Sequence, residues 1–137
     1  MGEACQVLSL VEVIEVNRRM ISVFGGIFFD GDSNQRNPGS LQHLIEAIQF
    51  PLFGYDAYPS VAEKAAALAW RIITTHVFHD GNKRTAMEAC RLLLAINGYD
   101  MRVDDDTISM ALHIAKHQVD FQTFVQWVEQ RTVRIRQ

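Results

Sequence analysis

The 137-residue sequence contains little cysteine and little proline, with two cysteines and three prolines. Cys5 and Cys90 lie far apart with no CxxC spacing, which argues against a disulfide framework and against a thiolate metal site. No unbroken apolar stretch approaches the roughly 18 residues of a membrane span, and no basic-then-apolar leader opens the chain. We therefore expect a cytoplasmic protein with no membrane partner.

An excess of positive charge is also missing, because the formal net charge is -3. A protein of this charge has no general attraction to phosphate backbones, so we expect no direct contact with nucleic acid. The C-terminal Arg131, Arg134 and Arg136 are predicted to lie on a solvated helix end, where the helix dipole favours cations. Hydrophobic residues make up 48% of the chain, and this composition and length predict a single domain over residues 1–137.

The periodicity is helical along most of the chain. Ser9 followed by Glu12 forms a capping-box pattern, which predicts the start of a first helix. Its apolar stripe continues to the Gly25–Gly26 pair and consists of Leu10, Val13, Ile14, Asn17, Ile21 and Phe24. Residues 25–39 are rich in Gly, Asn and Asp and are predicted to form a long loop, and loops of this length are usually functional or mobile.

Two shorter segments follow this loop. Ser40 is predicted to cap a second helix that closes at Pro51. Residues 50–59 are predicted to be irregular or extended, and three aromatic side chains make the segment a candidate surface flap: Phe53, Tyr55 and Tyr58.

Two strongly apolar helices are predicted near the middle of the sequence. The first follows a capping-box pattern at Ser60 and Glu63 and is apolar nearly all round, as buried helices are. The second covers residues 82–97. Two more helices are predicted, one from residues 104–106 to about His117 and one after Asp120. The expected fold is an all-α bundle around two central helices joined by one polar turn.

That turn, residues 76–85, combines residue types that bind phosphate. The N-terminus of a helix carries unpaired backbone N–H groups and about half a positive charge, so it attracts anions. Gly81 allows a ligand to approach the backbone, and Lys83 and Arg84 add cationic donors. The sequence therefore predicts an anion site, with phosphate as the natural ligand.

Two further residues of the turn point to chemistry at that phosphate. Asp80 can either cap the following helix or hold a magnesium ion that bridges phosphate oxygens. His76 can accept a proton from an attacking hydroxyl near physiological pH. Each residue alone is more often structural, and only their convergence in one turn predicts phosphoryl-type transfer.

The turn resembles the signature of the Fic/Doc superfamily at six positions: His76, Phe78, Asp80, Asn82, Lys83 and Arg84. The ending Asn-Lys-Arg-Thr-Ala at residues 82–86 resembles the Doc (death-on-curing) branch, and the similarity in order and spacing extends over residues 9–128. The resemblance implies a Fic/Doc-type helical bundle around the two central helices. It also implies the roles of the individual residues.

By this resemblance, His76 is the catalytic base and Asp80 binds Mg²⁺. Gly81 and Asn82 form the anion-binding turn, and Lys83 and Arg84 hold the phosphates of ATP. Fic enzymes that transfer AMP have glycine at the position of Lys83, whereas the Doc branch presents the γ-phosphate to the histidine. The implied activity is that of a protein kinase.

The resemblance also implies partners. Doc-like proteins are toxins of toxin–antitoxin pairs, neutralised by a Phd-like antitoxin helix, and the target associated with the branch is a threonine of elongation factor Tu. The loop after Gly26 departs from the branch pattern because it is longer, and Arg36-Asn37 is the candidate remnant of an Arg-Asp pair. Since loops beside a site dock partners, this departure bears on the antitoxin and the substrate more than on the chemistry.

Three other functions stay open. One is a Fic-type adenylyltransferase, and another is a Fic-fold module that binds a partner or nucleotide without catalysis. The third is an HD-type phosphohydrolase, which would use His79 and Asp80 as a metal dyad and would need further ligands such as His43 and Asp120. A hydrolase of that kind would leave Asn82, Lys83 and Arg84 without a role.

Overall fold

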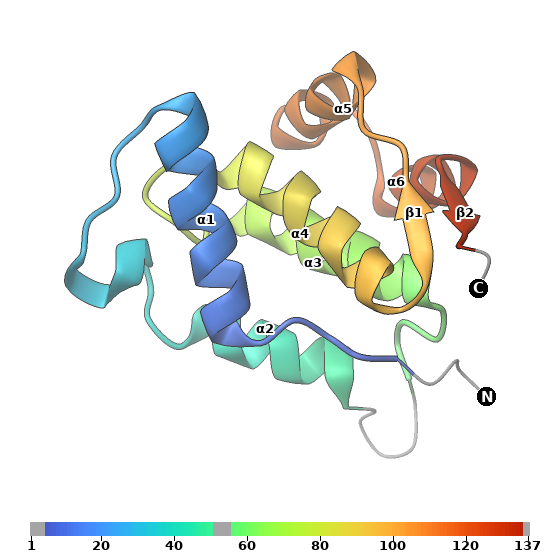
Figure 1. Cartoon of the computed structure of the whole chain (residues 1–137), viewed down its shortest axis with the longest axis horizontal. Coiled ribbons are helices and arrows are strands. Elements are labelled where there is room, and N and C mark those ends of the chain that lie inside the picture. The colour runs from blue at the N-terminus through green and yellow to red at the C-terminus, as the bar shows by residue number, and fades with distance from the viewer. Residues whose placement is uncertain (1–4, 51–55, 136–137) are drawn as a thin grey trace.

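The computed structural model describes residues 5–50 and 56–135 (Figure 1). Its helices are α1 (Leu10–Phe24), α2 (Ser40–Gln49), α3 (Val61–Thr75), α4 (Asn82–Ile96), α5 (Asp105–Ala115) and α6 (Phe121–Gln130). A 3-10 turn (Gly31–Asn34) lies between α1 and α2, and two short strands, β1 (Tyr99–Met101) and β2 (Thr132–Arg134), follow α4 and α6. The predicted all-α class is confirmed. Phe53 and Tyr55 of the candidate flap lie outside the described residues.

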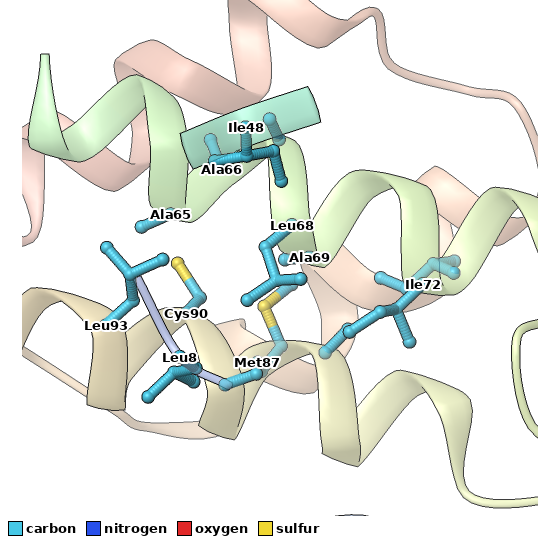
Figure 2. Packing of buried hydrophobic residues seen from close by; sticks show 14 of the residues in the cluster. Leu8, Ile48, Ala65, Ala66, Leu68, Ala69, Ile72, Met87, Cys90 and Leu93 are labelled. Atoms are coloured by element: carbon cyan, nitrogen blue, oxygen red, sulfur yellow. The ribbon is translucent and has the colours of Figure 1, made fainter. Parts of the chain in front are cut away.

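Helices α3 and α4 form the centre of the molecule and share its most extensive helix–helix contact (Figure 1). Alanines of both helices are fully buried, including Ala65 and Ala69 of α3 and Ala89 of α4. The distance between packed helices depends on the side chains at the contact, so small residues allow a close approach. Figure 2 shows Leu68 of α3 and Met87 of α4 pointing toward each other between the two helices.

The caps explain where the helices begin. Ser9 and Glu12 form the predicted capping box at the start of α1, and the Ser60 hydroxyl accepts from the Glu63 backbone N–H at the start of α3. The prediction for α2 is wrong by one residue, because the N-cap is Gly39 and Ser40 is already helical. Gly39 has a φ of 98°, a left-handed conformation that favours glycine at the end of the preceding loop.

The remaining helices surround the central pair. Helix α1 packs against α4, α2 packs against α3, and α5 and α6 cover the other side (Figure 1). The long loop between α1 and α2 lies at the same end of the molecule as the turn between α3 and α4 (Figure 1). The fold therefore brings two connections that are far apart in the sequence to one end of the bundle.

The two strands were not predicted from the sequence. They pair antiparallel, with Tyr99 opposite Arg134 and Met101 opposite Thr132. Each strand has three residues, too few to show a period-2 pattern of alternating apolar and polar residues. Their pairing holds the C-terminal segment against the residues that follow α4.

The expectation of a solvated arginine tail on a helix end is wrong for Arg131, whereas Arg134 is exposed but lies in β2 instead of a helix. Arg131 is 8% exposed, and its guanidinium donates to the Asp104 carboxylate and lies over the Trp127 ring at 4.6 Å. Helix α6 ends at Gln130, and β2 then turns the chain back onto the protein. Arg136 lies outside the described residues. Among the helices of the described segments, none has the length and apolar character that a bilayer crossing requires.

Candidate active site at the turn between α3 and α4

The turn is built by two left-handed residues. His76 ends α3 with a φ of 49°, and Gly81 is the N-cap of α4 with a φ of 76°. Between them, Val77 and Phe78 are buried. The turn thus has two anchored apolar residues in its middle and polar residues on either side.

Asn82 fixes the shape of the turn through its side chain. Its Oδ1 accepts from the Phe78 backbone N–H at 2.9 Å, and its Nδ2 donates to the Phe78 carbonyl at 2.8 Å. Both ends of the amide are therefore engaged inside the protein. The Asn82 side chain is therefore occupied within the turn, which leaves its backbone N–H as the group that could meet a ligand.

The N-terminus of α4 is open. The first intrahelical acceptor, the Gly81 carbonyl, receives the Thr85 backbone N–H at 2.9 Å, and no side chain caps the helix. The backbone N–H groups of residues 82–84 have no partner within the described part of the chain. Unpaired donors with the positive end of the helix dipole are the components of an anion site.

Asp80 does not cap α4. Its Oδ1 accepts from the Gly81 backbone N–H at 2.8 Å, and its Oδ2 accepts from the Ile27 backbone N–H at 3.0 Å. These two bonds orient an exposed carboxylate beside the helix N-terminus. Each carboxylate oxygen has two lone pairs, so one remains on each for a hard cation. The donor set fits Mg²⁺, which binds through one or two carboxylates together with substrate phosphates.

One cavity of about 170 Å³ is lined by all the predicted site residues except Arg84. His76, Asp80, Gly81, Asn82 and Lys83 line it, together with Ile73, His79 and Ala115. The candidate base, the candidate magnesium ligand and a cationic side chain therefore face one space at the open end of α4. His76 therefore lies at the same cavity as the open N-terminus of α4, as the phosphotransfer hypothesis requires.

Arg84 lies on the other side of the turn. It lines a second cavity of about 250 Å³, which shares the residues from Asp80 to Lys83 and extends to Met20 and Phe24 of α1. The Arg84 guanidinium stacks over the Phe24 ring at 3.9 Å from its centroid. Phe24 is 55% exposed and so is not the core residue that the helical stripe predicted. The predicted phosphate ligands thus line two adjacent cavities.

The long loop of residues 25–39 is part of the site. Its Ile27 contacts the Asp80 carboxylate, and its Arg36 backbone N–H donates to the Val77 carbonyl at 2.9 Å. The His79 backbone N–H donates to the Asn34 carbonyl at 2.9 Å. The sequence predicted a loop here but not its contacts, which depend mainly on backbone groups that carry no residue signature.

Two buried asparagines were also missed as site residues. Asn17 and Asn34 are fully buried and hydrogen-bonded to each other, and Asn17 donates to the Asp80 carbonyl at 2.9 Å. The sequence did contain a signal for Asn17, because it lies in the apolar stripe of the first helix. An amide buried on such a stripe needs hydrogen-bond partners. Asn34 gave no comparable signal within its polar loop.

The HD-type arrangement is not formed. Among the described residues, no group of three or more His, Cys, Asp or Glu side chains lies close enough to hold a metal ion. His43 and Asp120 therefore do not complete a metal shell around His79 and Asp80. The turn lacks the ligands that would hold a transition metal without a nucleotide.

The fold and the turn define an all-α protein in which the N-terminus of a central helix, α4, is open and has polar residues around it. A family model described as the Fic/DOC family matches residues 7–94, which include the whole turn. A protein named Toxin Doc, from Mycolicibacterium smegmatis (strain ATCC 700084 / mc(2)155), is 37% identical over 91 residues, which cover 66% of this chain and 70% of that protein. The chain belongs to the Fic/Doc family, and the similarity to Toxin Doc assigns it to the Doc branch.

Proposed function

We propose that this chain is a Doc-like toxin that transfers the γ-phosphate of Mg-ATP to a hydroxyl group of a protein. The observation that carries the proposal is the single cavity lined by His76, Asp80 and Lys83 at the open N-terminus of α4. Phosphoryl transfer depends on positioning and on charge stabilisation, and these residues provide both.

His76 accepts the proton of the attacking hydroxyl. The hydroxyl oxygen then forms a bond to the γ-phosphorus, the bond from that phosphorus to the bridging oxygen breaks, and ADP leaves. Asp80 would hold Mg²⁺, which when bound would supply positive charge to the phosphate oxygens. The unpaired N–H groups of residues 82–84 and the Lys83 ammonium stabilise the remaining negative charge.

Lys83 favours phosphate transfer over AMP transfer. It is exposed and lines both cavities beside the helix N-terminus. By the family resemblance, glycine at this position leaves room for the α- and β-phosphates of an AMP donor, whereas a lysine side chain fills that space. Adenylyl transfer is the second candidate activity, and it needs the opposite orientation of ATP.

The similarity to a protein named Toxin Doc supports a toxin–antitoxin pair as the setting of this chain. A toxin of this branch requires a cognate antitoxin, which we propose binds through a Phd-like helix beside the turn. The proposed substrate is a threonine of elongation factor Tu, and its modification would arrest translation in the cytoplasm. Direct contact with nucleic acid or a membrane has no part in this activity.

Labelled ATP tests the proposal. The purified chain is incubated with elongation factor Tu, Mg²⁺ and ATP that carries label on either the γ- or the α-phosphate. We expect label on the protein substrate from γ-labelled ATP only. Transfer from α-labelled ATP would instead establish the adenylyltransferase, and no transfer from either form, with a cell lysate as an additional substrate source, would favour the non-catalytic binding module.

A further inference from the structure

Asn34 is fully buried and makes hydrogen bonds both within the long loop and to the rest of the site. Its backbone N–H donates to the Phe29 carbonyl at 2.8 Å, and its Oδ1 accepts from the Phe29 backbone N–H at 3.0 Å. Its carbonyl accepts from His79, and its Nδ2 donates to Asn17 Oδ1 at 2.8 Å. Every polar group of Asn34 is therefore engaged: two bonds join it to Phe29 in the loop, one to His79 in the turn and one to Asn17 in α1.

Asn17 in turn makes hydrogen bonds to the turn and to α4. Its Nδ2 donates to the Asp80 carbonyl at 2.9 Å and to the Thr85 hydroxyl at 3.0 Å. The amide also lies directly beneath the turn, because a Cβ built on Gly81 would be 3.2 Å from Asn17 Nδ2. Asn17 thus links the loop, through Asn34, to the residue that bears the candidate magnesium ligand.

The loop adopts a costly backbone conformation to place Asn34. Three consecutive non-glycine residues, Asp32, Ser33 and Asn34, have φ values of 56°, 52° and 64°. A left-handed conformation is unfavourable for residues with a Cβ, and such strain persists only where the surroundings hold it. The engaged polar groups of Asn34 are what hold it here.

Asp80 is held from both sides by this arrangement. Its carbonyl accepts a hydrogen bond from Asn17 Nδ2, and its carboxylate accepts one from the Ile27 backbone N–H. Ile27 lies two residues before Phe29, which Asn34 holds in place. We infer that Asn17 and Asn34 are positioning residues that orient the Asp80 carboxylate for Mg²⁺ through the loop and the turn. This inference rests on the proposed function for the role of Asp80, but not for the contacts themselves.

The test uses two glycine substitutions in adjacent loop residues. Asn34→Gly removes the amide and tolerates the left-handed backbone, whereas Ser33→Gly relieves the same strain one residue earlier and leaves the Asn34–Asn17 bond in place. A merely structural role of the loop predicts similar behaviour of both variants. If Asn34→Gly does not fold, Asn34→Asp serves instead, because it keeps the acceptor for Phe29 but cannot donate to Asn17.

The first measurement is hydrogen exchange at the Ile27 amide in the absence of nucleotide, at conditions where both variants have equal global stability. We expect exchange in the Asn34 variant to be faster by about tenfold, because the segment that presents this amide to Asp80 is released. Equal exchange in the two variants would overturn the inference. This measurement does not depend on the proposed function.

The second measurement is the Mg²⁺ concentration required for binding of a fluorescent ATP analogue. We expect the Asn34 variant to need about tenfold more Mg²⁺ than Ser33→Gly, as for the loss of other residues that orient a metal ligand. An equal Mg²⁺ requirement in the two variants would overturn the role of the asparagines in orienting Asp80 for Mg²⁺. If the unmodified protein binds no Mg-ATP, the proposed function fails, and the exchange measurement alone decides whether the asparagines position Asp80.

Discussion

Gly26 leaves the space that the Asp80 carboxylate occupies. A Cβ at Gly26 would lie 2.8 Å from Asp80 Oδ2, closer than real Cβ atoms approach another heavy atom, and 3.3 Å from Asp80 Cγ. The next residue, Ile27, donates its backbone N–H to the same Oδ2. The start of the long loop is therefore shaped around the carboxylate that we propose binds Mg²⁺.

The Gly25–Gly26 pair provides a matched test of that relationship. Both glycines have positive φ, 94° and 129°, but a Cβ at Gly25 would meet nothing within 4 Å. We expect Gly26→Ala to displace Asp80 and to weaken Mg²⁺-dependent ATP binding by about tenfold or more. Gly25→Ala, which carries backbone strain without the clash, should retain most of the binding. Equal losses in a titration of Mg²⁺ would contradict the steric explanation.

His76→Ala tests the proposed base. Loss of a general base typically lowers the rate by about 10² to 10⁴. We expect transfer from γ-labelled ATP to fall by this factor, while Mg-ATP binding changes little because the helix N-terminus and Lys83 remain. Rates of labelling and nucleotide affinity measured side by side check both points. Activity equal to that of the unmodified protein would exclude His76 as the base.

Lys83→Gly tests the orientation of the nucleotide. We expect the substitution to weaken γ-phosphate transfer by about tenfold or more, because a charge-assisted contact to phosphate is lost. We also expect AMP transfer to become measurable, since the space filled by the lysine is vacated. Parallel reactions with α- and γ-labelled ATP provide the measurement. Unchanged γ-transfer would show that Lys83 does not set the orientation.

The ion pair between the buried Lys64 and the partly exposed Asp56 predicts a pH dependence of stability. Lys64 Nζ lies 3.0 Å from Asp56 Oδ1 and also donates to the Ile48 carbonyl, and the lysine side chain is 5% exposed. The hydrogen bond from Lys64 lowers the pKa of Asp56 below its usual range. The stabilisation by this pair is therefore complete above the unfolded-state pKa of about 3.9 and is lost as the pH falls through the lower folded-state pKa.

We expect Asp56→Asn to lower the free energy of unfolding by about 3 kcal/mol at pH 7, since it leaves a buried charge without its partner. The deficit relative to the unmodified protein should shrink as the pH falls below about 4, because Asp56 is then protonated first in the unfolded chain and, at its lower pKa, in the folded protein. Urea unfolding at pH 7 and again below about pH 4 measures this difference in the free energy of unfolding. The control is Glu15→Gln in the exposed pair with Arg18, which should cost less than about 1 kcal/mol. A deficit independent of pH would contradict the assignment.

The helices were predictable because their signals are local. Ser9, Ser60 and Asp120 all cap helices where the sequence predicts it, and the apolar periodicity identifies the central pair. The β1–β2 pairing joins Tyr99 to Arg134, and nothing within three residues of either strand indicates so distant a partner. Arg131 was misjudged for the same reason, because its acidic partner Asp104 lies 27 residues away.

The site was predictable to the extent that it is one continuous segment. His76 and the residues from His79 to Lys83 line one cavity because the turn itself brings them together. The contribution of the loop could not be predicted, since Ile27 acts through its backbone N–H and Asn34 through partners in α1 and the turn. Asn17 was visible as an amide within an apolar stripe, but that pattern does not identify its partners.

The turn is anchored by Val77 and Phe78, which belong to the same apolar core that joins α3 to α4. Its geometry therefore cannot loosen by itself while that core stays packed. Nucleotide binding should disappear on heating in the same cooperative transition as the helical circular dichroism signal, rather than in an earlier local melting step. In this architecture, heat tolerance of the fold and heat tolerance of the site are one property.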